Sequence, residues 1–189
     1  MILGITGGTG CGKTTLLKEI EARGGLVLDC DAVYHELLTR DMELLNAIDE
    51  RFPGVVVAGE LQRKKLGAIV FSDEAALADL NSITHGAIKE EVVRRLAQAP
   101  NLAAIDAIAL FEGGLADLCD TTVAVSAPRE ARVERLMKRD DISRDYAEKR
   151  IDAQKSEAWF RDNCAYVLVN DGTAEEFRIK CAAFLDDIL

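Results

Sequence analysis

The sequence lacks the segments that linkers, disulfide frameworks and membrane spans require. It contains three prolines in 189 residues and no repeat or low-complexity tract. Its five cysteines include no Cys-x-x-Cys pair, which favours free thiols. No apolar run reaches the roughly 20 residues that a membrane-spanning helix needs. These absences predict one compact chain that does not enter a membrane.

Basic residues are also in the minority, with 23 lysines and arginines against 33 acidic residues and a net charge of −10. Proteins that bind nucleic acid through their general field are usually basic, so the composition argues against such a partner. An anionic ligand would have to be held by local arginines and backbone N–H groups. No signal peptide is evident, so we expect a cytoplasmic protein; the sequence leaves the oligomeric state open.

The most informative pattern that is present is Gly-x-x-x-x-Gly-Lys-Thr at residues 7–14, directly after the apolar run Ile2–Thr6. A helical pattern, Lys13–Arg23, follows. Strand, glycine-rich turn and helix form the context of a P-loop, which binds nucleoside triphosphates. Lys13 can reach the β- and γ-phosphates, and the Thr14 hydroxyl can bind Mg²⁺. A turn that merely favours glycine would not explain the lysine and the threonine.

Apolar runs and the helical patterns between them predict an α/β fold with a five-stranded parallel sheet and flanking helices. The expected strands are Ile2–Thr6, Leu26–Leu28, Leu102–Leu110, Thr121–Val125 and Tyr166–Val169. The helical patterns between the second and third strands are Asp31–Leu38, Glu43–Phe52, Leu61–Val70, Asp73–Asn81 and Thr84–Ala97. Because this is more than a crossover needs, we expect residues 31–99 to form an inserted helical lobe that covers a substrate.

A second unusual segment carries Arg132, Arg135 and Arg139 on one helix face. Ser143 can cap a following helix that bears Arg150. A solvated charged hairpin fits this pattern equally well. Beside a P-loop we interpret residues 138–155 as a lid that closes over phosphates. The expected core is then 1–30, 100–137 and 156–189.

Carboxylates follow two of the predicted strands. Asp29 and Asp31 come after the second strand, at the sheet edge where ligands bind in open α/β folds. Either side chain could meet an acceptor hydroxyl, and Asp31 could instead cap a helix. Asp106 in the third strand needs a partner such as Lys13 or a Mg²⁺-bound water. Which of the three aspartates assists Mg²⁺ is left open.

Two basic side chains of the lobe are further candidates. Arg63 could bind an acceptor phosphate or lie on a solvated face. His85, after an expected helix break, could contact the substrate or cap the next helix; a lone histidine is more often structural.

This ordered set of motifs resembles the dephospho-CoA kinase family over nearly the whole chain. The matching segments are Ile5–Thr15, Val27–Asp31, Arg63–Phe71, Ile83–His85, Leu110–Glu112, the lid residues Arg135, Arg139, Asp140, Ser143, Arg150 and Gln154, and Val169–Thr173. The sequence has Gly86 and Ile108-Ala109 where the family usually has proline-containing segments. The P-loop alone is shared by many families, whereas the ordered combination is specific.

The resemblance implies a nucleoside-monophosphate-kinase-like P-loop fold and transfer of phosphate from ATP to the ribose 3′-hydroxyl of 3′-dephospho-CoA, giving CoA and ADP. It implies nucleotide binding by Gly8, Gly10, Cys11, Gly12, Lys13, Thr14, Thr15, Arg139 and Asn170, with Thr14 on Mg²⁺. It implies catalytic roles for Lys13, Asp31 and Arg139, Asp31 being the base. The acceptor side would comprise Asp31, Arg63, His85, Glu112 and Arg150.

Two other functions fit the P-loop. One is a kinase for another nucleotide or small alcohol. The other is a partner-regulated NTPase, which the lid arginines argue against because they would supply cations from the same chain.

Overall fold

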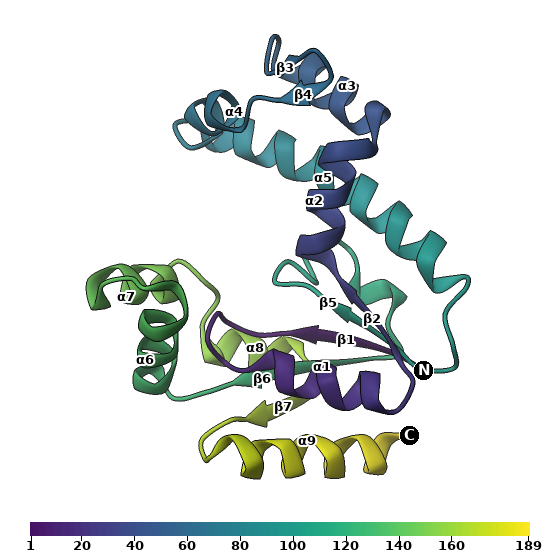
Figure 1. Ribbon diagram of the computed structural model, residues 1–189, viewed down its shortest axis with the longest axis vertical. Helices are drawn as coiled ribbons and strands as arrows, with labels where there is room; N and C mark the ends of the chain where they lie inside the picture. Colours follow the sequence, from purple (N-terminus) through teal and green to yellow (C-terminus); the bar gives the residue numbers. More distant parts are fainter. The chain divides into compact units, whose positions relative to one another are not determined.

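The computed structural model describes all 189 residues, which form two compact units (Figure 1). The core unit comprises Met1–Leu28, Ala99–Phe111 and Leu115–Leu189. The helical lobe comprises Asp29–Gln98 and Glu112–Gly114. No helix of the structure combines the length and apolar character needed to cross a membrane.

The core unit is built on the predicted five-stranded sheet, in the order β2-β5-β1-β6-β7. The pairs of β1 with β5, β1 with β6 and β6 with β7 are parallel. The strands are β1 (Ile2–Thr6), β2 (Leu26–Asp29), β5 (Ala103–Asp106), β6 (Thr121–Ser126) and β7 (Tyr166–Val169). The predicted fold class is confirmed.

Helices cover both faces of this sheet because its central strands are apolar on both sides. On one face Val123 and Val125 of β6 pack in a cluster with α1 (Lys13–Ala22) and α9 (Ala174–Ile188), which lie side by side in Figure 1. On the other face Ala124 packs against Phe160 of α8 (Glu157–Asn163). The last helix of the chain, α9, and α1, which begins directly after the P-loop, therefore cover the same face of the sheet.

Two further helices of the core unit, α6 (Arg129–Asp140) and α7 (Arg144–Asp152), form a hairpin with its own small apolar cluster. Asp141 ends α6 in a left-handed conformation, with φ 52°. Ser143 caps α7 as the sequence predicts, its hydroxyl accepting the N–H of Tyr146. A short 3₁₀ helix, Ala116–Leu118, lies between β5 and β6.

The helical lobe contains four helices and a short antiparallel hairpin between β3 (Val56–Val57) and β4 (Glu60–Leu61) that the sequence did not predict. Its helices are α2 (Cys30–Arg40), α3 (Met42–Arg51), α4 (Arg63–Val70) and α5 (Glu74–Leu96). Leu45, Ile48, Phe52 and Val55 are buried in a core of the lobe's own. The lobe therefore has the apolar interior expected of an independently packed unit.

A buried carboxylate also ties the lobe together. Glu91 of α5 accepts hydrogen bonds from Arg94, Arg95 and Arg40, the last from α2. The bond from Arg94, followed by that from Arg95, lowers the pKa of Glu91 to about 2. The carboxylate therefore stays ionised at neutral pH and joins α2 to α5.

The structure corrects two predicted elements. The helix break before His85 does not exist: α5 runs unbroken from Glu74 to Leu96, and the Thr84 hydroxyl donates to the carbonyls of Leu80 and Asn81 inside the helix. The third strand ends at Asp106, not at Leu110. Its apolar run continues because Ala107 and Leu110 are buried in the following turn.

We expect the lobe to depend on its apolar core. Ile48 has no exposed surface, so Ile48→Ala should lower the free energy of unfolding by about 2–5 kcal/mol. The matched control is Ile179→Ala, since Ile179 is 55% exposed on α9. Urea unfolding followed by circular dichroism measures both. Equal midpoints for the two variants would contradict the assignment of Ile48 to the core.

Candidate active site

The P-loop joins β1 to α1, and its glycines are needed for close approach by other parts of the core unit. A Cβ on Gly7 would lie 2.2 Å from the Val125 carbonyl oxygen, and one on Gly8 would lie 2.2 Å from the Arg132 guanidinium. Gly12 combines a φ of 98° with a similar approach by Asn170. The glycines of the P-loop therefore make room for other protein atoms.

Side chains from distant segments hold the P-loop backbone. Arg135 of α6 donates to the carbonyl of Gly10 at 3.1 Å. The Asn170 amide, after β7, donates to the carbonyl of Cys11 at 2.9 Å, and Asn170 is only 6% exposed. These bonds occupy carbonyl groups of the loop. Nucleotide contact by Asn170 stays a prediction; in the structure it supports the loop.

Lys13 and Asp106 lie together at the end of the central strands. The Lys13 ammonium donates to the Gly7 carbonyl at 3.1 Å and lies 4.0 Å from a carboxylate oxygen of Asp106. Parallel pairing of β1 with β5 places Asp106 opposite Ile5. The predicted partner of Asp106 is thus confirmed as Lys13. Thr14, the second residue of α1, is exposed.

The thiol of Cys11 is buried inside the loop. Burial is the largest influence and raises its pKa, while the charges of Arg132 and Lys13 act in the opposite direction. The thiol therefore stays protonated at neutral pH, as a small apolar residue of the loop would require.

Two arginines of the predicted lid share one carboxylate. Arg139 donates two hydrogen bonds to Asp140, and Arg150 donates one. The Arg139 bond, then the Arg150 bond, lowers the Asp140 pKa to about 2. Arg139 and Arg150 make no hydrogen bond to the P-loop, so their action on phosphates stays a prediction.

The two aspartates at the end of β2 have different roles: Asp29 is its last residue, and Asp31 follows it. Asp29 is the N-cap of α2, and its carboxylate accepts the N–H groups of Asp31 and Ala32. The Asp31 carboxylate is exposed and makes no hydrogen bond or ion pair. The alternative that Asp31 caps the helix is therefore wrong, because Asp29 takes that position.

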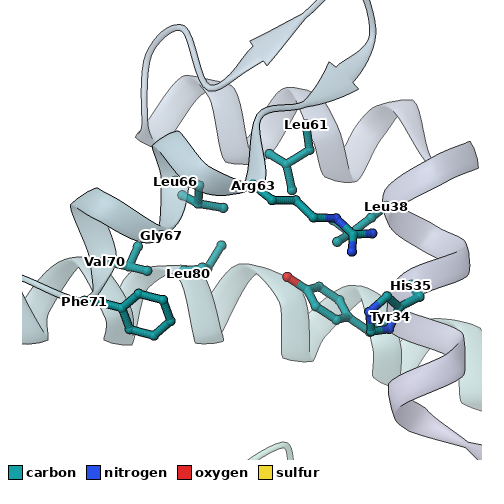
Figure 2. A pocket seen from close by; sticks show the side chains of 10 residues that line it. All are labelled: Tyr34, His35, Leu38, Leu61, Arg63, Leu66, Gly67, Val70, Phe71 and Leu80. Carbon is teal, nitrogen blue, oxygen red and sulfur yellow. The ribbon is translucent and has the colours of Figure 1, made fainter.

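Arg63 lines a pocket of the lobe with a volume of about 190 Å³. Figure 2 shows Arg63 of α4 and Tyr34 of α2 pointing into it, with Phe71 at the opposite end. Burial raises the pKa of the Tyr34 hydroxyl, against the lowering influence of the Arg63 charge. The pocket thus offers one cation and aromatic surface. His85 and Glu112 belong to the lobe but do not line the pocket.

The sequence did not predict Tyr34 as a pocket residue, nor the contacts that Arg132 and Gln154 make with the P-loop. Arg132 donates to the Thr9 carbonyl and Gln154 accepts the Thr9 N–H. The spacing of the α6 arginines was a usable signal, since Arg132 shares a face with Arg135. No local pattern indicates that Gln154 contacts Thr9, because the two residues are 145 positions apart.

The sequence of the whole chain was compared with those of known proteins, and it matches one family. The family model described as dephospho-CoA kinase matches residues 1–176. The dephospho-CoA kinase of Latilactobacillus sakei is 34% identical, covering 98% of this chain and 95% of its own. That of Deinococcus radiodurans is 38% identical, covering 92% of this chain and 85% of its own.

Solved structures agree with the fold. The crystal structure of TT1252 from Thermus thermophilus matches with a TM-score of 0.83 and 32% identity, covering 100% of this chain and 98% of that one. A shikimate kinase from Bacteroides thetaiotaomicron, 17% identical, matches with a TM-score of 0.55 over 98% of each chain, a likeness of fold alone. The sheet and its helices are thus those of P-loop kinases, and by its match over residues 1–176 the chain belongs to the dephospho-CoA kinase family.

Proposed function

We propose that this chain transfers the γ-phosphoryl group of ATP to the ribose 3′-hydroxyl of 3′-dephospho-CoA, the last step of coenzyme A synthesis. The observation that carries this function is the family match over residues 1–176 of a chain whose P-loop holds Lys13 beside Asp106. Because ATP is the phosphoryl donor, we place the reaction in the cytoplasm, with a small molecule as the acceptor.

Phosphate binding falls to the P-loop and Lys13. Apart from the Thr9 N–H, which Gln154 accepts, the backbone between Gly8 and Thr15 and the N-terminus of α1 favour anionic oxygens. Lys13 supplies positive charge to the transferring group. The Thr14 hydroxyl and the Asp106 carboxylate are oxygen donors of the kind that Mg²⁺ prefers, so they would hold the ion, which neutralises phosphate charge when bound.

The acceptor side falls to the lobe. Asp31, with a carboxylate that has no other partner, orients and deprotonates the 3′-hydroxyl. Arg63, pointing into the lobe pocket, binds an acceptor phosphate. His85 and Glu112 are assigned to the acceptor side by resemblance alone.

The arginines of the lid complete the charge of the site. We assign residues 138–155 as a lid, in which Arg139 and Arg150 exchange Asp140 for phosphate oxygens as it closes. Cations from the chain itself then meet the transferring group.

A coupled assay of ADP release, with and without 3′-dephospho-CoA, tests the reaction. ADP release that depends on this acceptor supports it. No ADP release with dephospho-CoA, together with turnover of another nucleotide or alcohol, would show that the acceptor is a different molecule. ADP release that needs no acceptor would indicate an NTPase.

We expect Lys13→Ala to lower kcat by about 10³-fold, because it removes charge stabilisation from the transferring group. Lys18→Ala is the matched control, since Lys18 is exposed on the same helix. Steady-state ADP release and thermal melting measure both variants. A Lys13→Ala variant that keeps wild-type kcat would remove Lys13 from catalysis.

We expect Asp31→Asn to lower kcat by about 10²- to 10⁴-fold with the KM for ATP unchanged, because the acceptor loses its base. Asp29→Asn is the control, since asparagine caps helices as well as aspartate does. If only Asp29→Asn were slow, the base would be Asp29.

A further inference from the structure

Arg132 of α6 is a buried positive charge with only neutral partners. It is 6% exposed and lies against the P-loop. Its Nε donates to the Thr9 carbonyl at 2.9 Å, and its Nη2 donates to the Gln154 side-chain oxygen at 3.1 Å. Burying a charge without an opposite charge beside it is costly, so a chain that does so calls for an explanation.

The carboxylates of Asp152 and Glu130 are engaged by other arginines. Asp152 of α7 is the carboxyl group whose pKa the Arg132 charge affects, but its main partner is Arg129, which donates two hydrogen bonds to it. On α6 itself, Glu130 pairs with Arg144. Arg132 forms no ion pair, so hydrogen bonds alone stabilise its guanidinium.

Gln154 holds the position where a carboxylate would neutralise this charge. Its side-chain oxygen accepts both the Thr9 N–H, at 2.8 Å, and the Arg132 guanidinium. Both partners are donors, which fixes the orientation of the amide with its oxygen toward them. A glutamate has the same shape and could accept the same two hydrogen bonds, but it would also cancel the charge.

The charge of Arg132 reaches the interior of the P-loop. Its guanidinium lies against the Gly8 Cα, where a Cβ would be 2.2 Å from Nη2. Its charge also acts on the Cys11 thiol, together with that of Lys13. The Arg132 charge would therefore attract an anion bound in the loop, because charges separated by a short path of protein atoms are poorly screened.

We propose that Arg132 is a positioning residue for the polyphosphate: it fixes the Thr9 peptide of the P-loop, and its charge is left without a carboxylate so that the phosphates themselves are its counterion. Gln154 keeps the charge uncompensated. This inference rests on the proposed binding of ATP by the loop. With Gln154 the ligand-free protein is therefore less stable, and its affinity for phosphate is higher, than with a glutamate at position 154.

Gln154→Glu in the full chain tests this directly, because the two effects have opposite signs. Without ligand the variant should melt at a higher temperature than wild type, since Arg132 gains a carboxylate. Its dissociation constants for ADP and for pyrophosphate, measured by calorimetry, should both rise roughly tenfold, as expected for one charge acting through protein of intermediate dielectric. The KM for ATP should rise by a similar factor.

Two comparisons separate charge from structure. Arg132→Gln should weaken pyrophosphate binding about as much as Gln154→Glu, whereas Arg132→Lys, which keeps the charge, should retain more affinity than Arg132→Gln. Gln98→Glu, exposed in the lobe, adds the same net charge elsewhere and should change neither property.

A Gln154→Glu variant that melts lower without ligand, or that binds ADP and pyrophosphate like wild type, would overturn the inference. A loss confined to ADP would also overturn it, because pyrophosphate carries the same kind of charge without the adenosine. In each case wild-type binding of ADP would leave the proposed function intact. Wild-type protein that binds neither ligand would instead reject the proposed function.

Discussion

The hydrogen bonds that other segments donate to the carbonyls of the P-loop are the interaction on which the site depends. Residues 7–12 have no regular secondary structure, yet Arg135 and Asn170 occupy the carbonyls of Gly10 and Cys11. A buried loop without such partners would leave polar groups unsatisfied. The loop therefore has its shape before any phosphate arrives, and binding need not order it.

The Arg135 bond also joins the P-loop to the hairpin of α6 and α7. Arg135 lies one turn from Arg139 on α6, so one helix serves both the loop and the predicted lid. Catalysis benefits when charged groups are held in place in advance. Under the role proposed for Arg139, α6 both supports the loop and supplies a cation, which reduces the number of parts that must be ordered at once.

Short-range pattern was enough to predict the strand–loop–helix of the P-loop and the parallel sheet, because periodicity and glycine spacing are local. It failed at α5, where the hydroxyl of Thr84 bonds within the helix and does not end it. It also extended β5 too far, since Leu110 is buried without being in a strand. The contacts of Arg132 and Gln154 with Thr9 join residues more than 120 positions apart, and no local signal contains them. The roles of Asp31, Arg63 and Arg139 stay predictions.

The order of strands has a consequence for how such enzymes diversify. The chain leaves the sheet at β2 to build the lobe and returns at β5, and these two strands are neighbours. An insertion whose two ends join adjacent strands can change in length or be exchanged without altering the strand order. The hydrogen bonds that support the P-loop are also kept. Under the proposed assignment of the acceptor to the lobe, the choice of acceptor could change without altering the sheet or the P-loop.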